Sequence, residues 1–529
     1  MRVIGLLSPT MPLSLLLGAA HVLLWVPTGL AAGEIQPDQK LVGALDRLME
    51  EHWREVGATP ADPVDDAGLL RRLSLDLLGR IPTLAETRAF LADPSPDRRA
   101  RLVLRLLNSP EYPLQMGRVL DEIVQAKFAG DAESIDYFRR AMAAGKSWEQ
   151  MFREVLLGPW DTPDRQGAAR FLLQRLRNLD DLTNDSAIAF FGVNVSCAKC
   201  HDHPLVDDWK QDHYFGLASF FNATYEGSKS NRGKSGSAAI AEKATMPITF
   251  NTTKGERRTA KLMFLSGRVV EATAPTGLRH QLVQVALEDK TFFSRAIVNR
   301  LWDYFIGRGL VSPVDQMHSG NPPVVTGVLE LLADDLVAHG YDLNRLVAAL
   351  VSSRVYQLAS VPSTPGEPPD EALFAVAPLR PLTPAQYALS LVVAAGEPRL
   401  DAAASPADRV KAYRELEGAA ATLLNARLFD TRGERYQASA GEALFMSNNP
   451  DVQKWMVPVG SNLAARLSAL SAADDVVDTA VAAILSRSAT QAERSFLSAW
   501  LRDRGQDRAK AGGQLIWALV TSAEFRFNH

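Results

Sequence analysis

The stretch from Val195 to Pro204 reads VSCAKCHDHP and holds the only two cysteines of the 529-residue chain, with two of its nine histidines. Cys197 and Cys200 stand three positions apart and His201 follows directly, which is the pattern C-x-x-C-H. Thiols at this spacing can be joined to the two vinyl groups of a haem as thioethers, while the adjacent imidazole binds the iron from one face. The pattern indicates a unit that holds one cofactor.

Two apolar segments flank this stretch. Ala187 to Phe191 precedes it and ends at Gly192, and a segment carrying Leu217, Phe220 and Phe221 follows it. Apolar side chains at helical spacing mark a face that is buried against a core. We therefore expect the cysteines to lie in a loop between two buried helices, dry on one side and open on the other.

Most of the remaining chain also has helical patterning. Apolar residues recur at helical spacing from Lys40 to Asp76. Thr83 with Glu86 three residues later forms a capping box, which opens a helix through Leu91. The fold class predicted is mainly α, with multi-helix bundles in two domains.

One region departs from this pattern. Met246 to Phe250 and Lys261 to Phe264 have the composition of short strands, and Gly267 is suited to a turn before Val269. We expect a small β insert around residues 245–270.

The length of the chain is too great for one compact core and suggests roughly two to four domains. Four prolines between Val361 and Pro369 mark a linker. The organisation expected is a signal peptide (1–32), a helical domain carrying C-x-x-C-H (38–226), a mobile loop and small β insert (227–277), the first part of a second helical domain (278–360), a proline-rich linker (361–378) and the C-terminal helical part of that domain (379–529).

The N-terminus has the pattern of a secretory signal peptide. Arg2 is followed by an apolar run, densest at residues 15–17 and 22–26, and by small residues that place cleavage near Ala31 or Gly33. An uncleaved anchor is the alternative. No later stretch approaches the roughly 18 apolar residues that span a bilayer. We expect an exported protein of the periplasm or cell envelope, with no transmembrane helix after signal cleavage.

The composition excludes one class of partner. A net charge of -4 and a pI near 6.2 give no basic face for nucleic acid. No serine nucleophile elbow, P-loop or dinucleotide fingerprint stands in a convincing context, so the sequence leaves open whether the protein is an enzyme. An unknown redox or envelope partner is the expectation.

Three occupants of the motif remain open from the residues alone. The first is covalent haem c on Cys197 and Cys200 with His201 on the iron. The second is a mononuclear zinc or other metal site, in which the two cysteines are joined by one or two of His201, His203 and His213. The third is a disulfide between the cysteines, without a cofactor, in a binding or scaffold module.

Other polar residues add candidates. A second axial ligand of the iron would come from a methionine or histidine elsewhere: Met246, Met263, His213, His280, Met317 or His318. Asp202 is the carboxylate we expect to orient an imidazole, whereas Asp207, Asp208 and Asp212 are expected to lie in a solvated loop. We expect Arg300 to bind the C-terminus of a helix and Trp302 to lie in the core.

The sequence resembles a known family. CAKCHDHP, with Trp209 to Gln211 and Phe215 to Phe221, is similar to the planctomycete cytochrome-motif domain, a domain of undefined biochemical function, as are Arg71 to Gly79 and Leu106 to Tyr112. Further segments resemble the planctomycete-specific domain that usually follows the cytochrome-motif domain, namely Ala296–Trp302, Phe305–Val311, Gly320–Pro323, Val355–Gln357 and Glu524–His529. The resemblance covers nearly all of the expected mature chain and implies more about fold than about function. Many relatives carry a separate cytochrome-like domain, whereas the single C-x-x-C-H motif here leaves one possible haem.

Overall fold

The computed structural model describes residues 34–159, 162–203, 206–227, 240–244, 247–272, 276–363, 366, 369–396, 398–425, 440–505 and 507–529. The expected signal peptide, most of the loop predicted to be mobile, Pro204 and the candidate ligand Met246 lie outside these residues. No helix among the described residues is long and apolar enough to cross a membrane.

The fold is mainly α, as predicted. The helices of the N-terminal region are α1 (Gln39–Glu55), α2 (Asp66–Leu78), α3 (Leu84–Leu91), α4 (Arg98–Leu107), α5 (Tyr112–Gln125), α6 (Ala132–Ala143), α7 (Trp148–Leu157), α8 (Arg170–Leu173), α9 (Leu179–Phe191) and α10 (Gln211–Phe221). A middle group follows with α11 (Leu278–Asp289), α12 (Phe293–Ile306), α13 (Val328–Ala338) and α14 (Leu343–Ser352). The C-terminal group comprises α15 (Pro384–Ala395), α16 (Pro406–Asn425), α17 (Ala440–Asn448), α18 (Pro450–Trp455), α19 (Leu463–Ser468), α20 (Ala473–Ile484), α21 (Gln491–Asp503), α22 (Arg508–Val520) and α23 (Ala523–Arg526).

Side-chain caps explain where several helices begin. Asp38 accepts hydrogen bonds from the amides of Lys40 and Leu41 at the start of α1. The capping box of Thr83 and Glu86 is present at α3, as predicted. Each such cap satisfies an amide that the helix leaves without a partner, and is worth about 1 kcal/mol.

The β structure of the described residues is limited to short antiparallel pairs. These are β1 (Thr224–Glu226) with β2 (Ile240–Glu242), β3 (Thr249–Asn251) with β4 (Arg257–Thr259), and β5 (Arg380–Pro381) with β6 (Phe527–Asn528). A strand over Lys261 to Phe264 was expected and is wrong, because a tight turn at Gly255 pairs β4 with β3 several residues earlier. Met263 makes only an isolated bridge to Val269.

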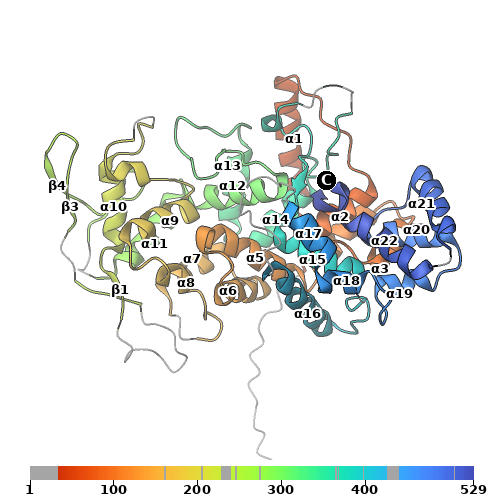
Figure 1. The fold of residues 1–529 in the computed structure, drawn as a ribbon. Coiled ribbons are helices and arrows are strands. Elements are labelled where there is room, and N and C mark those ends of the chain that lie inside the picture. Colours follow the sequence, from red (N-terminus) through yellow and green to blue (C-terminus); the bar gives the residue numbers. More distant parts are fainter. Residues whose placement is uncertain are drawn as a thin grey trace, which may run out of the picture.

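Two hydrophobic cores hold these helices. The first runs from Leu41 to Ala375, so it joins the N-terminal and middle groups of helices. The second contains residues from Leu382 to Phe525, together with Leu75, Ile81 and Leu114 from the N-terminal region. Figure 1 shows α9, α10 and α11 towards one end of the molecule and α19 to α22 at the other. The C-x-x-C-H turn therefore lies on the first core, far along the molecule from the C-terminal helices.

Candidate functional site

The motif lies between α9 and α10, as predicted. Cys197 is within a 3-10 turn over Ser196–Lys199, and Cys200 follows it. Ala198 is fully buried between the two cysteines, whereas both thiols are free and exposed. The apolar residue anchors the turn on the core, and the two sulfur atoms remain accessible from solvent.

Hydrogen bonds fix the entrance to this turn. The side-chain oxygen of Asn184 accepts from the amide of Val195 at 2.9 Å. The side-chain oxygen of Asn194 accepts from both the amide and the hydroxyl of Ser196, at 3.1 and 2.7 Å. The chain before Cys197 is thereby held by side chains as well as by its own backbone.

Gln211 fixes the exit. Its side-chain amide donates to the carbonyl oxygens of Lys199 at 3.4 Å and Cys200 at 3.2 Å, and it is buried. Its backbone amide donates to the carboxylate of Asp202 at 3.0 Å. Because buried polar groups with satisfied partners rigidify their surroundings, the thiols are presented by a preorganised turn.

The orientation of His201 bears directly on ligand binding. Its side chain is exposed, and Nδ1 lies 2.8 Å from the carbonyl oxygen of Asp202. A carbonyl oxygen only accepts, so Nδ1 carries a proton, and in the neutral ring Nε2 then has the free lone pair. Metal-ligating histidines share this arrangement, in which the other ring nitrogen donates to a backbone carbonyl. The expectation that the carboxylate of Asp202 orients this imidazole is wrong, because the backbone carbonyl makes the contact while the carboxylate accepts from the amide of Gln211.

His213 has a different role. Its Nδ1 accepts from the backbone amide of Lys210 at 3.3 Å, at the start of α10. The neutral ring therefore carries its proton on Nε2, and burial, which disfavours the charged form, lowers the pKa of His213. The ring also packs edge-on against Trp209, with centroids 6.0 Å apart. In this structure His213 is a capping residue.

His203 is half-buried, and its backbone amide donates to the carbonyl of Trp209 at 2.8 Å. Within the described residues, no group of three or more histidine, cysteine, aspartate or glutamate side chains is placed to hold a metal ion. The convergence that a mononuclear site requires is therefore not found around Cys197, Cys200, His201, His203 and His213.

The candidates for a second axial ligand have separate surroundings. Met317 is buried against Gly192 at the end of α9, where an added Cβ would lie 3.0 Å from its sulfur. Nδ1 of His318 accepts from the amide of Gly320 at 3.2 Å. Met263 lies against Gly216 of α10, and His280 is exposed. These contacts do not single out any of these four residues as the second axial ligand.

A loop of the middle region docks on the motif, which the sequence did not indicate. The amide and hydroxyl of Ser319 donate to Asp208 at 2.7 and 2.5 Å. Asn194 donates to the carbonyl of Asp315 at 2.9 Å. Although burial acts to raise it, the hydrogen bonds from Ser319 lower the pKa of Asp208. Asp208 is therefore a structural contact rather than part of a solvated loop.

The expectations for Arg300 and Trp302 hold. Arg300 donates to the carbonyl of Ile188 near the end of α9 at 2.7 Å, and Trp302 is fully buried. Asp212 was expected in a solvated loop, and this is wrong, because it lies in the first turn of α10, where its carboxylate pairs with Arg258 at 3.0 Å near the surface.

Fold and site together define a mainly α-helical protein with two cores and an exposed Cys-x-x-Cys-His turn. Residues 44–226 match the family model described as PSCyt2, a protein of unknown function (DUF1549). Residues 278–427 match the model described as PSD1, a protein of unknown function (DUF1553). The two matches follow each other in the order of the planctomycete pairing that the sequence resembles. No curated protein and no solved structure matches the chain.

Proposed function

We propose that this chain is an exported cytochrome-like protein that binds one haem covalently through Cys197 and Cys200, with His201 as an axial ligand of the iron. The observation that carries the proposal is the hydrogen bond from Nδ1 of His201 to the carbonyl of Asp202, at 2.8 Å, beside two free exposed thiols. It leaves Nε2 as the ligand atom, next to the two groups that form thioethers.

The donor set fits haem better than zinc. Covalent haem needs two reachable thiols and one imidazole, all of which the turn presents to solvent. Zinc needs about four ligand atoms around one point, and Nδ1 of His213 instead accepts from the amide of Lys210, the residue that caps α10. A bound haem would supply one-electron redox chemistry. The chain would contribute rigid attachment, through Ala198 and Gln211, and an orienting hydrogen bond to the axial imidazole.

The exposure of the turn supports electron exchange with a partner. Cys197, Cys200 and His201 all reach the surface, so a group held there would have an edge open to another redox protein of the envelope. Export is proposed on the N-terminal pattern of residues 1–32, which would deliver the thiols to the compartment where haem is attached.

The test is absorbance spectroscopy of the full chain, produced with its N-terminal segment in a host that attaches haem to exported proteins. We expect a Soret band and a haem that stays with the chain after denaturation and acid extraction. Cys197→Ala and Cys200→Ala should each lose at least one thioether. His201→Ala should keep covalent pigment but change its spectrum, because the axial ligand is removed.

His339→Ala is the matched control. His339 is also exposed, and its Nδ1 lies 2.9 Å from the carbonyl of Asp335, but no thiol stands next to it. This variant should retain the spectrum. If the chain is colourless and binds one equivalent of a metal, and if Cys197→Ala abolishes that binding, the metal site is supported instead. If the chain is colourless and metal-free and has a Cys197–Cys200 disulfide, the scaffold module is supported.

A further inference from the structure

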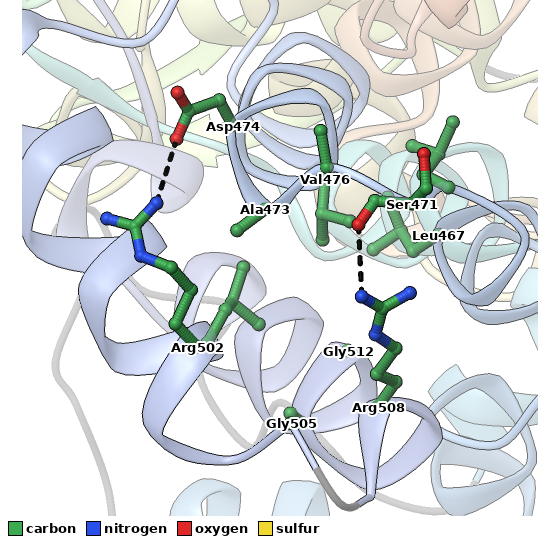
Figure 2. Close-up of a pocket in the computed structure, with 13 residues that line it drawn as sticks. Leu467, Ser471, Ala473, Asp474, Val476, Arg502, Gly505, Arg508 and Gly512 are labelled. Atoms are coloured by element: carbon green, nitrogen blue, oxygen red, sulfur yellow. Dashed lines mark hydrogen bonds and ion pairs between the residues drawn. The ribbon is translucent and has the colours of Figure 1, made fainter.

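We propose that the C-terminal helices hold a second binding site, for a small monoanion with an apolar chain, such as a medium-chain carboxylate. The site is a cavity of about 450 Å³ bordered by α19, α20, α21 and α22 (Figure 2). This volume is within the range of small-molecule pockets. The inference goes beyond the proposed haem function and depends on none of its residues.

Short side chains at the meeting point of these helices leave the space open. Ala472 and Ala473 begin α20, and Ala511 and Gly512 lie in the first half of α22. They cannot fill the volume that larger residues would occupy. Leu467, Leu470, Val476 and Leu501 supply the apolar part of the remaining wall, and polar and charged side chains supply the rest. An apolar chain placed between them would leave water, and each buried methylene strengthens binding about fourfold.

Three charged side chains stand at the cavity. Arg502 and Asp474 are 3.7 Å apart and more than half exposed, so their attraction is weak. Arg508 donates to the backbone carbonyl of Ser471 at 3.0 Å, a neutral acceptor that leaves its charge available. Figure 2 shows the Asp474–Arg502 pair at the left of the view and the Ser471–Arg508 hydrogen bond at the right, with Ala473 and Val476 between them.

The charge balance selects the kind of anion. Two arginines and one aspartate leave a net charge of about +1 at the cavity, which one carboxylate would neutralise and a phosphate dianion would exceed. A guanidinium also matches the two oxygens of a carboxylate with parallel hydrogen bonds. The apolar walls and this charge together favour an amphipathic monocarboxylate.

The experiment is calorimetric titration of the full chain with decanoate, compared with decanol and decyl phosphate. We expect decanoate to bind with one-to-one stoichiometry, and decanol to bind at least about tenfold more weakly because it lacks the charge. Arg508→Gln should weaken decanoate binding by about tenfold. Arg504→Gln is the matched control. Arg504 is a nearby arginine at the C-terminal end of α21, but its guanidinium stacks on Trp500, 4.4 Å from the ring centroid, and it does not line the cavity.

A second variant tests the cavity itself. Ala473→Leu should fill the space and abolish binding of decanoate, with folding checked by circular dichroism. If Arg508→Gln fails to fold, Arg508→Lys replaces it and should bind about threefold more weakly, because the charge remains but the paired hydrogen bonds do not. The proposal is overturned if the wild-type chain shows no saturable binding of decanoate, or if decanol or decyl phosphate binds to it as tightly as decanoate. It is also overturned if Arg504→Gln weakens decanoate binding as much as Arg508→Gln, or if the Ala473→Leu variant binds decanoate as tightly as the wild type.

Discussion

At the scale of single residues, the site depends on how each imidazole is paired with the backbone. His201 donates from Nδ1 to a carbonyl, whereas His213 accepts at Nδ1 from an amide. The same side chain is therefore prepared as a ligand at one position and as a helix cap at the other. Sequence proximity to the cysteines does not distinguish them, because the difference is made by the backbone group that each ring faces.

Asp208 gives a residue-scale prediction about pH. Its pKa is lower in the folded chain than the ordinary value of 3.8, so its ionised form favours folding above that value. This contribution is lost as the pH falls through the folded pKa. We expect Asp208→Asn to lower the free energy of unfolding by about 1 kcal/mol at pH 7, with a difference that narrows below about pH 4. Urea unfolding at several pH values measures it.

The control for this prediction is Asp212→Asn. The Asp212 side chain is 46% exposed and pairs with Arg258, which is 49% exposed. We therefore expect Asp212→Asn to change the free energy of unfolding little, both at pH 7 and below about pH 4. An equal effect of the two substitutions would contradict the role assigned to the Ser319 hydrogen bonds.

At the scale of elements, the end of the chain is tied to α2. β6 pairs with β5, and the side-chain amide of Asn528 donates to Asp76 at 2.8 Å. Asp76 is 1% exposed and also accepts from Tyr356 at 2.9 Å and pairs with Arg380 at 2.7 Å. Burial raises the pKa of this carboxyl, and the partners around it act in the opposite direction. A buried carboxylate thus connects three segments that lie far apart in the sequence.

Asn528→Asp tests this connection. The substitution removes a donor and sets a second carboxylate beside a buried one, so we expect a loss of about 2–3 kcal/mol in the free energy of unfolding at pH 7. Thermal or urea unfolding of the full chain provides the measurement. Asn448→Asp makes the same chemical change at an exposed asparagine whose side-chain amide donates to the carbonyl of Leu444, and should have little effect. Comparable losses in both variants would refute the connection.

At the scale of the whole molecule, a network of charged side chains joins the first core to α16. Arg80 is fully buried, and it pairs with Glu86 at 2.8 Å and with Glu111 at 2.9 Å. Arg409 of α16 contacts both of these carboxylates, with 2.9 Å to Glu111. Since the side chain of Glu111 is fully buried, it depends on both arginines for its charge balance.

Arg409→Ala should therefore loosen the attachment of α16. We expect a loss of about 2 kcal/mol in the free energy of unfolding and a broader unfolding transition, because one of the connections between the two cores is removed. Calorimetry of the full chain follows both changes. Arg414→Ala is the control on the same helix, because its pairing with Asp136 at 3.5 Å is between side chains that are 48% and 42% exposed. If Arg414→Ala shifts the curve as much, the buried network is not what couples α16 to the first core.

Local interactions made much of this fold predictable from sequence. The helices around the motif, the capping box at Thr83 and the placement of the cysteines between α9 and α10 depend on residues within a few positions of each other. The strand expected over Lys261 to Phe264 was misplaced because the turn at Gly255, rather than apolar alternation, sets the register of β3 and β4.

By itself the sequence determined the helical class, the C-x-x-C-H unit and its position between two buried helices, since periodicity, capping and motif spacing are all short-range. Only the tertiary structure decided that Asp208 binds Ser319, 111 residues away, and that small residues leave a cavity among α19 to α22. These features arise where segments distant in the chain pack together. Their geometry is set by the cores, and no local pattern encodes it.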